Sequence, residues 1–249
     1  MKRLFGMSGK KISVYDEAFS FSRELPVAKR VLVLAAHPDD ETLGCGGTIA
    51  LHKAAGAEVR SFVMADGSKI FYQGKEDIKE IRKKEALGAG EVLGIDNIYF
   101  LNMPDMQLEK NINRVSAETF SIINEYQPDL VYAPSPVDFH PDHLVASRIA
   151  LKVLKKGIKI AFYEIYMPIR FNMLIDITQV MPLKEKAILL YVSSLLGNPS
   201  HFVRSIKGLN AYRAFLTGAT EEEKFYEAFF VMDKYWKASR LIKWLTYNL

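Results

Sequence analysis

The chain has 249 residues, of which 49% are hydrophobic and 25% are charged, a composition that is ordinary for one soluble globular domain. Its formal net charge of +4 is too weak and too scattered along the chain to indicate a nucleic-acid-binding surface. The single cysteine, Cys45, excludes an internal disulfide framework and any metal site built from several thiolates. A metal site must therefore use His, Asp or Glu, and we expect a reducing, cytoplasmic compartment.

The sequence predicts neither a signal peptide nor a membrane span. Residues 1–14 contain basic side chains but lack the apolar core of a signal peptide. The longest apolar run, 187–196, is far short of the ~20 residues that cross a bilayer.

We expect a single domain over 1–249, with an N-terminal extension over 1–29, an α/β core over 30–180 and a mainly helical elaboration over 181–249.

Apolar runs and helical patterns alternate along this core. Strands are predicted over 30–36, 57–65, 97–101, 128–135 and 159–166, and helices over 41–56, 75–94, 113–126 and 143–157. This alternation predicts a Rossmann-like, mainly parallel sheet with helices on both faces, in three αβα layers. With a strand order of 3-2-1-4-5, the first and fourth strands would be neighbours where the order reverses, which is where such sheets bind ligands.

Charged residues gather where these two strands end. The sequence HPDDE at 37–41 follows the first strand, and VDFHPDH at 137–143 follows the fourth. The carboxyl ends of parallel strands lie at one edge of a sheet, so both clusters should face one crevice although about a hundred residues separate them.

The residue types in the two clusters predict a catalytic metal site. His37, Asp40 and His143 form a three-ligand set that suits Zn²⁺ and leaves one position for water, and another divalent ion could occupy the same ligands. Zinc would lower the pKa of that water toward ~7 and polarise a carbonyl group. Asp39 is then the best candidate for the general base.

The second cluster also predicts groups that assist the reaction. His140 is free to stabilise an oxyanion and protonate a leaving nitrogen, and Asp142 is placed to orient a histidine and stabilise its charge. The other two histidines, His52 in a helix and His201 in a loop, are interpreted as structural or surface residues.

A glycine cluster offers a competing interpretation. The sequence LGCGG, followed by Asp66 at the end of the second strand, imitates a dinucleotide-binding turn. Gly44 and Gly46 supply the first two glycines, but Ile49 stands at the third position. These glycines are better explained by close packing of the first helix on the sheet.

Taken together, these motifs resemble the LmbE-like, or PIG-L, family of zinc-dependent N-acetylglucosaminyl deacetylases. The similar segments are AHPDDE at 36–41, GCGGT at 44–48, ADG at 65–67, RKKE at 82–85, MPD at 103–105 and DFHPDH at 138–143. The resemblance covers about 30–176 and implies a hydrolase that removes the N-acetyl group from an N-acetylglucosamine-type conjugate. It also places the family's metal ligands on His37, Asp40 and His143, its base on Asp39 and its acid on His140.

The resemblance further implies residues that bind the substrate. Arg82 would hold the sugar or its anionic aglycone, although its pattern also fits a cation on a solvated helix face. Glu41 and Asp66 would shape the substrate site, and Glu41 could equally be an acid favoured at a helix start. The family often has a Ser-Gln pair where this chain has Ser193 and Ser194, a departure that concerns the substrate pocket.

The C-terminal segment 233–249 predicts a basic amphipathic helix. Such a helix could pack on its own domain or on a subunit neighbour, or adsorb to an anionic membrane. Adsorption to a membrane would suit a lipid-linked substrate and a peripheral location at the inner membrane face. Family members are often assemblies, which implies a homo-oligomer.

Two other functions stay open from the sequence. One is hydrolysis of another small N-acyl amide by the same chemistry. The other is a non-catalytic protein that binds a metal or nucleotide on a Rossmann-like fold.

Overall fold

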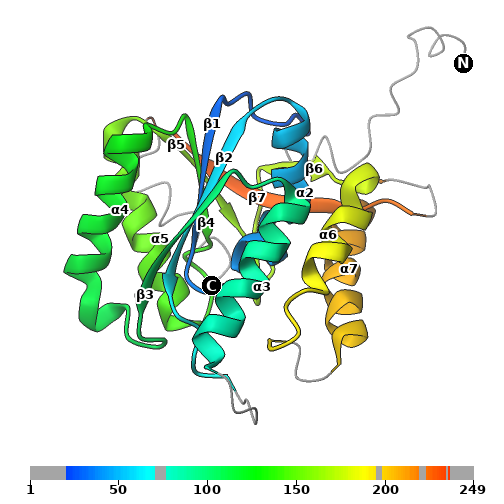
Figure 1. Ribbon diagram of the computed structural model, residues 1–249. Helices are drawn as coiled ribbons and strands as arrows, with labels where there is room; N and C mark the ends of the chain where they lie inside the picture. The colour runs from blue at the N-terminus through cyan, green and yellow to red at the C-terminus, as the bar shows by residue number, and fades with distance from the viewer. Residues whose placement is uncertain (1–20, 71–76, 195–197, 219–222, 234, 236–249) are drawn as a thin grey trace, which may run out of the picture.

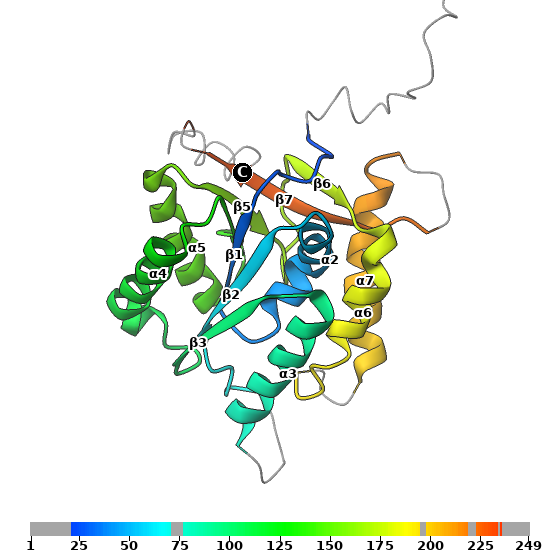
Figure 2. The same ribbon diagram turned by 45° about the horizontal axis from the view of Figure 1, so that its top comes forward.

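The computed structural model describes residues 21–70, 77–194, 198–218, 223–233 and 235, which form a seven-stranded sheet with helices on both faces (Figures 1 and 2). The strands are β1 (Arg30–Ala35), β2 (Glu58–Ala65), β3 (Asn97–Met103), β4 (Leu130–Pro134), β5 (Lys159–Tyr163), β6 (Met173–Asp176) and β7 (Tyr226–Met232). The α-helices are α2 (Asp40–Ala54), α3 (Ile78–Leu93), α4 (Ile112–Tyr126), α5 (Pro141–Val153), α6 (Met181–Ile188) and α7 (Pro199–Phe215). Short 3₁₀ turns are η1 (Glu109–Asn111), η2 (Leu154–Lys156) and η3 (Thr178–Val180).

The strand order of the sheet is β3-β2-β1-β4-β5-β7-β6. The first five strands in this order are parallel, whereas β7 runs antiparallel to both β5 and β6. The predicted α/β class and the predicted order 3-2-1-4-5 are both confirmed. The carboxyl ends of β1 and β4 are therefore adjacent, at the point where the strand order reverses.

Alternating side chains of the buried strands build a core on each face of the sheet. Val31 and Val33 of β1 pack into the core under α2, α3 and α6, and Leu32 and Leu34 pack into the core under α4 and α5. Figure 1 shows the three layers, with α4 and α5 on one side and α2, α3, α6 and α7 on the other.

The C-terminal third departs from the sequence-based expectation. No strand over 226–232 was predicted within the mainly helical elaboration expected over 181–249, although β7 is an almost continuous buried apolar run. The fifth strand ends at Tyr163 rather than at residue 166, and the carboxylate of the next residue, Glu164, pairs with Arg213 of α7. His201, expected in a loop, lies exposed in the first turn of α7.

The glycines at the start of α2 allow the close packing that was predicted for them. A Cβ atom on Gly44 would stand 2.1 Å from the ring of Tyr163 on β5, and one on Gly47 would stand 2.7 Å from Ile177. A side chain at either position would push the helix away from the sheet. The dinucleotide interpretation thus loses the feature that suggested it, since the glycines serve helix packing.

A buried ion pair supports the middle of α2. The helix is interrupted at Cys45, whose φ of −144° is not helical, so the N–H groups of Gly47 and Thr48 begin a new helical segment. The carboxylate of Glu227 on β7 accepts both N–H groups, at 2.9 and 2.7 Å. The Nζ atom of Lys184 lies 2.6 Å from the same carboxylate, and all of these groups are buried.

Replacing Glu227 should therefore destabilise the fold strongly. Glu227→Ala leaves the ammonium group of Lys184 buried without its counter-charge, a change that typically costs about 3–5 kcal/mol. The free energy of unfolding in urea measures this loss. The matched control is Glu185→Ala, whose carboxylate forms a partly exposed pair with Lys207 and should cost about 0–1 kcal/mol. Equal, small losses in the two variants would contradict this account of the ion pair.

Candidate metal centre and active site

Asp40 lies at the junction of β1 and α2, where its carboxylate is fixed by the backbone. Oδ2 accepts the N–H groups of Ala36 and His37 at 2.8 and 2.9 Å, which holds the acid at the end of the strand. The other oxygen, Oδ1, faces α5 and lies 3.3 Å from Nε2 of His143. The side chain is 2% exposed. One carboxylate oxygen is thus left to bind a ligand in the crevice.

The ring of His37 is held between carboxylates. Its Nε2 atom lies 3.1 Å from Oδ1 of Asp105, at the end of β3, and 3.4 Å from Oδ2 of Asp142 on α5. Its Nδ1 atom lies 3.8 Å from Asp40. Asp142 in turn accepts the backbone N–H groups of Met106 at 2.8 Å and Leu108 at 3.1 Å. Histidines that bind metals commonly have the second ring nitrogen oriented by an acid in this way.

His143 has a similar arrangement on the other side of the crevice. Its Nδ1 atom lies 3.3 Å from Oδ2 of Asp138, so Nε2 is the atom that faces Asp40. Neither ring nitrogen completes a well-formed hydrogen bond with any part of the chain that the structure describes, although the ring is fully buried. A buried imidazole without hydrogen bonds is costly unless another partner, such as a metal ion, uses the nitrogen.

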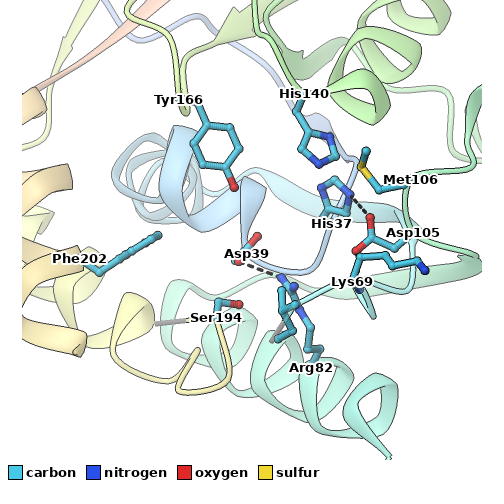
Figure 3. Close-up of a pocket in the computed structure, with 11 residues that line it drawn as sticks. His37, Asp39, Lys69, Arg82, Asp105, Met106, His140, Tyr166, Ser194 and Phe202 are labelled. Carbon is cyan, nitrogen blue, oxygen red and sulfur yellow. Dashed lines mark hydrogen bonds and ion pairs between the residues drawn. The ribbon is translucent and has the colours of Figure 1, made fainter. Parts of the chain in front are cut away.

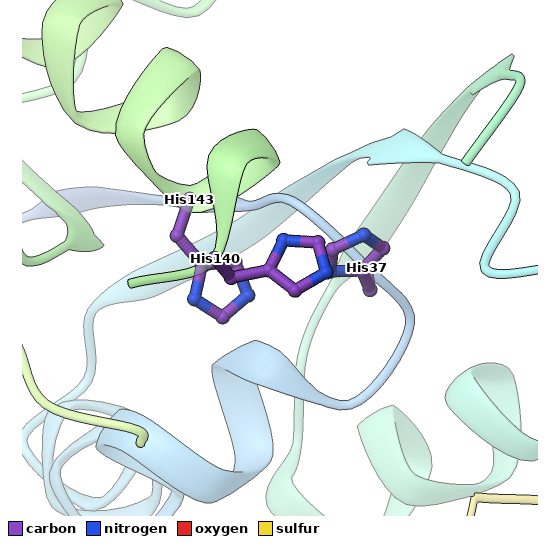
Figure 4. A group of neighbouring side chains, drawn as sticks. All are labelled: His37, His140 and His143. Carbon is purple, nitrogen blue, oxygen red and sulfur yellow. The ribbon is translucent and has the colours of Figure 1, made fainter. Parts of the chain in front are cut away.

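The predicted metal ligands lie beside one another. Nδ1 of His37 is 3.8 Å from Oδ2 of Asp40, and Nε2 of His143 is 3.3 Å from Oδ1 of the same carboxylate. Among the described residues, the two sets that bring ligand atoms of three residues within 4.8 Å of one another are His37 with His140 and His143 (Figure 4), and His37 with Asp105 and Asp142. Neither set includes Asp40, so the assignment of Asp40 as a ligand stays a prediction. In the latter set, both oxygens of Asp142 accept backbone N–H groups, whereas Asp40 accepts them through Oδ2 alone.

The pKa values of His37 and His143 also indicate that the crevice favours positive charge. Burial would lower the pKa of His37, but the hydrogen bonds with Asp105 and Asp142 raise it to about 9. Burial also opposes the charged form of His143, and the neighbouring Asp40 nevertheless raises its pKa to about 10. The acids thus stabilise a proton on each ring. A divalent cation satisfies the same electrostatic field with the rings deprotonated.

Asp39 is the residue before α2, and its backbone has a strained conformation. Its φ of 136° is rare for a residue other than glycine, and such strain is often found at functional sites. The guanidinium group of Arg82 on α3 donates to Oδ2 of Asp39 at 2.9 Å and to the carbonyl of Pro38 at 2.6 Å. Burial raises the pKa of Asp39, and the charge of Arg82 opposes that rise.

Arg82 is 3% exposed, which excludes the alternative that it is a cation on a solvated helix face. It also donates to the carbonyl of Gly67 at 3.1 Å. A Cβ atom at Gly67 would stand 2.8 Å from the guanidinium group, and its φ of +63° also favours glycine. Arg82 lines the cavity together with Asp39. Its contact with Asp39 is observed, whereas its contact with substrate stays a prediction.

His140 is the N-cap of α5, with Pro141 at the first helical position. Its Nδ1 atom accepts the backbone N–H group of Asp142 at 3.2 Å. A neutral imidazole that accepts through Nδ1 carries its proton on Nε2, which makes His140 a hydrogen-bond donor. Burial lowers the pKa of this half-buried ring and so favours the neutral form.

Two of the predicted substrate-site residues lie beside the cavity and are absent from its lining. Glu41 is fully buried in the first turn of α2, where it accepts the Tyr191 hydroxyl at 2.6 Å, and burial raises its pKa to about 7. Asp66 accepts the backbone N–H of Asp105 at 3.2 Å and pairs with Lys79 at 2.9 Å. Asp66 thus holds the loop that carries Asp105, whereas Glu41 bonds Tyr191, and the predicted contacts of both acids with substrate stay predictions.

A cavity of about 380 Å³ opens above these groups (Figure 3). Its lining comprises His37, Asp39, Lys69, Ile70, Arg82, Asp105, Met106, His140, Tyr166, Ser194 and Phe202. The sequence motifs had pointed to the segments around Asp105 and Asp138 without assigning them roles. Tyr166 was missed, and the signal for it was its place at the carboxyl end of the predicted fifth strand.

Comparisons with known proteins agree with this geometry. The sequence profile of the PIG-L family, described as GlcNAc-PI de-N-acetylase, matches residues 32–154. The E. coli K12 protein named uncharacterized deacetylase YaiS is 30% identical over 141 residues, which cover 55% of this chain and 74% of that protein. The chain belongs to the PIG-L family.

Other relatives extend the similarity beyond the profile. Diacetylchitobiose deacetylase of Thermococcus kodakarensis is 28% identical over 208 residues, covering 70% of this chain and 76% of that protein. The solved structure of N,N'-diacetylchitobiose deacetylase from Pyrococcus horikoshii has a TM-score of 0.72 at 27% identity, and the match covers 91% of this chain and 96% of that one. These relatives, which are named as deacetylases, confirm the predicted family and the predicted deacetylase activity.

Removing one ligand should abolish metal binding. We expect His143→Ala to lose bound zinc after dialysis against a limiting zinc buffer, because the mutation removes Nε2 opposite Asp40. Inductively coupled plasma mass spectrometry measures the zinc content per chain. His201→Ala, which changes an exposed histidine of α7, should retain the wild-type content. Retention of zinc by His143→Ala would contradict the assigned site.

Proposed function

We propose that this protein is a metal-dependent N-deacetylase that removes the acetyl group from an N-acetylglucosamine-type conjugate. The observation that carries the proposal is that His37 and the strained Asp39 line a small-molecule cavity, with the buried Asp40 carboxylate 3.8 Å from His37 and 3.3 Å from His143. The named relatives are deacetylases, two of them of diacetylchitobiose, which supports the amino-sugar class.

The ion that fits these ligands would supply an activated water and a polarised carbonyl group. We assign the proton of that water to Asp39, whose carboxylate reaches the cavity and whose pKa is raised by burial. Arg82 holds one oxygen of Asp39 in place, which leaves the other oxygen for the proton. We propose Arg82 as a residue that positions the base.

His140 supplies the second hydrogen-bonding group of the proposed reaction. Its Nε2–H can donate to the oxygen that becomes negative when the amide carbonyl is attacked. The amide nitrogen must gain a proton as its bond to the carbonyl carbon breaks. Protonated Asp39 and His140 both line the cavity from which that proton would come. The products are acetate and a free amine.

Zinc is our proposed metal, since two imidazoles and a carboxylate suit it, and another divalent ion could use the same ligands.

We propose a cytoplasmic homo-oligomer, with Cys45 kept reduced. None of the helices in the described ranges is long and apolar enough to cross a membrane. The predicted amphipathic helix over 233–249 lies almost entirely outside the described residues, so its membrane contact and a lipid-linked substrate remain proposals.

Asp39→Asn should separate the base from the metal site. The amide keeps an oxygen for Arg82 but cannot take a proton, so kcat should fall by about 10²–10⁴-fold while the zinc content stays at the wild-type level. The measurement is acetate release from N,N'-diacetylchitobiose and other N-acetylglucosamine conjugates, with zinc analysis of the same sample. Glu109→Gln, a surface change, should keep full activity. Near-normal turnover by Asp39→Asn would falsify the assignment of the base.

Membrane contact can be tested independently of catalysis. If the C-terminal segment adsorbs to lipid, the full chain should sediment with vesicles rich in anionic phospholipid, and a chain truncated before Asp233 should stay in solution. Salt should weaken the binding because basic side chains provide part of it. Equal and negligible sedimentation of both chains would exclude the membrane proposal.

A further inference from the structure

Two exposed aromatic side chains contact each other next to the cavity: Tyr166 lines it, and Phe139 packs against Tyr166. Phe139, which precedes His140, is 66% exposed, and Tyr166, which follows β5, is 51% exposed. Their ring centroids lie 5.2 Å apart, and we call this pair the aromatic rim. Large aromatic side chains are usually buried, so an exposed pair next to a functional cavity indicates a binding surface.

The position of the rim is fixed by the catalytic residues beneath it. The ring of Tyr166 lies parallel to that of His143, with centroids 5.5 Å apart and planes within 6°. The backbone N–H of Tyr166 donates to the same Asp138 carboxylate that lies against His143. Figure 3 shows the Tyr166 hydroxyl directed into the cavity on the side of Asp39. The rim is therefore held in register with the reacting groups.

A second ion pair fixes the loop that carries Tyr166. The guanidinium group of Arg213 on α7 pairs with the carboxylate of Glu164 and donates to the carbonyl of Ile169 at 2.9 Å. The Glu164 carboxylate also accepts the N–H of Ile169 at 3.0 Å. These buried bonds close the loop at both ends, so the rim is preformed and needs little ordering on binding.

The size of the cavity indicates what the rim would meet. About 380 Å³ is near the lower end of the range for small-molecule sites, which suits one acetamido sugar and leaves the rest of a conjugate at the mouth. Neither rim side chain is charged. Lys69, an exposed cation that also lines the cavity, extends away from Tyr166 on the opposite side in Figure 3. The rim thus suits a neutral group.

We propose that Phe139 and Tyr166 form a subsite for a neutral pyranose ring attached to the N-acetylated sugar. The C–H groups on one face of a pyranose are weakly positive and apolar, and they pack well on the negative face of an aromatic ring. This inference rests on the proposed function, which it narrows to conjugates whose aglycone begins with a neutral sugar.

The test compares substrates that differ in the aglycone. For the zinc-loaded wild type and for Phe139→Ala, kcat/KM is measured by acetate release from N,N'-diacetylchitobiose and from N-acetylglucosamine. The ratio of the two values should fall by roughly five- to tenfold in Phe139→Ala, the size of one aromatic contact. Phe139→Tyr, which keeps the ring, should restore the ratio. Phe215→Ala, which removes an exposed aromatic ring from α7, is the matched control and should leave the ratio unchanged.

Three results would overturn the subsite. The first is an unchanged ratio in Phe139→Ala. The second is an equal fall for N-acetylglucosaminyl malate, whose anionic aglycone has no ring to stack. The third is a smaller molecular mass of Phe139→Ala in light scattering, since the rim would then be a contact between copies of the chain.

A binding measurement separates this inference from the proposed function. Calorimetric titration of N,N'-diacetylchitobiose into the Asp39→Asn enzyme, with and without Phe139→Ala, requires no turnover. Binding that weakens with Phe139→Ala, in a protein whose wild type releases no acetate, would support the subsite and contradict the deacetylase. Acetate release with affinity independent of Phe139 would contradict the subsite and support the deacetylase.

Discussion

The carboxylate of Asp40 joins the two halves of the site. One of its oxygens is held by two backbone N–H groups at the end of β1, and the other faces His143 on α5. This contact is possible because β1 and β4 are neighbours in the sheet, which brings the segments that follow them to one edge. The positions of His37, Asp39 and His140 all depend on this meeting of two loops that lie about a hundred residues apart in the sequence.

Buried acids around the crevice set its chemistry. Asp105, Asp138 and Asp142 orient the two imidazoles from behind and also accept backbone N–H groups from the loops that carry the site. The same carboxylates therefore fix the loops and supply the negative field that favours a cation in front of the rings. Arg82 restrains Asp39 within this field, so the proposed base is held apart from the proposed ligands.

Much of this arrangement follows from the sequence, because parallel α/β sheets obey strong topological rules. The order of the first five strands, the crevice and the convergence of 37–41 with 137–143 were all predicted in this way. Local patterns could not reveal the burial of Arg82, because its contact with Asp39 spans 43 residues. They also missed β7 and its Glu227, whose partners Gly47 and Lys184 are brought together only by tertiary packing.

The mouth of the cavity is built from segments that local patterns describe poorly, such as the loop after β5 and the helix α7. Tyr166 of the proposed aromatic rim donates its backbone N–H to the same Asp138 carboxylate that lies against His143, so the proposed subsite and the proposed metal site share one acid.

The central claim is that His37, Asp40 and His143 hold the catalytic metal. X-ray diffraction from crystals of the zinc-loaded protein, recorded at the zinc absorption edge, tests it. The account predicts one anomalous peak between Nδ1 of His37, Oδ1 of Asp40 and Nε2 of His143. A peak between Nε2 of His37, Asp105 and Asp142, or no peak in this crevice, would contradict it.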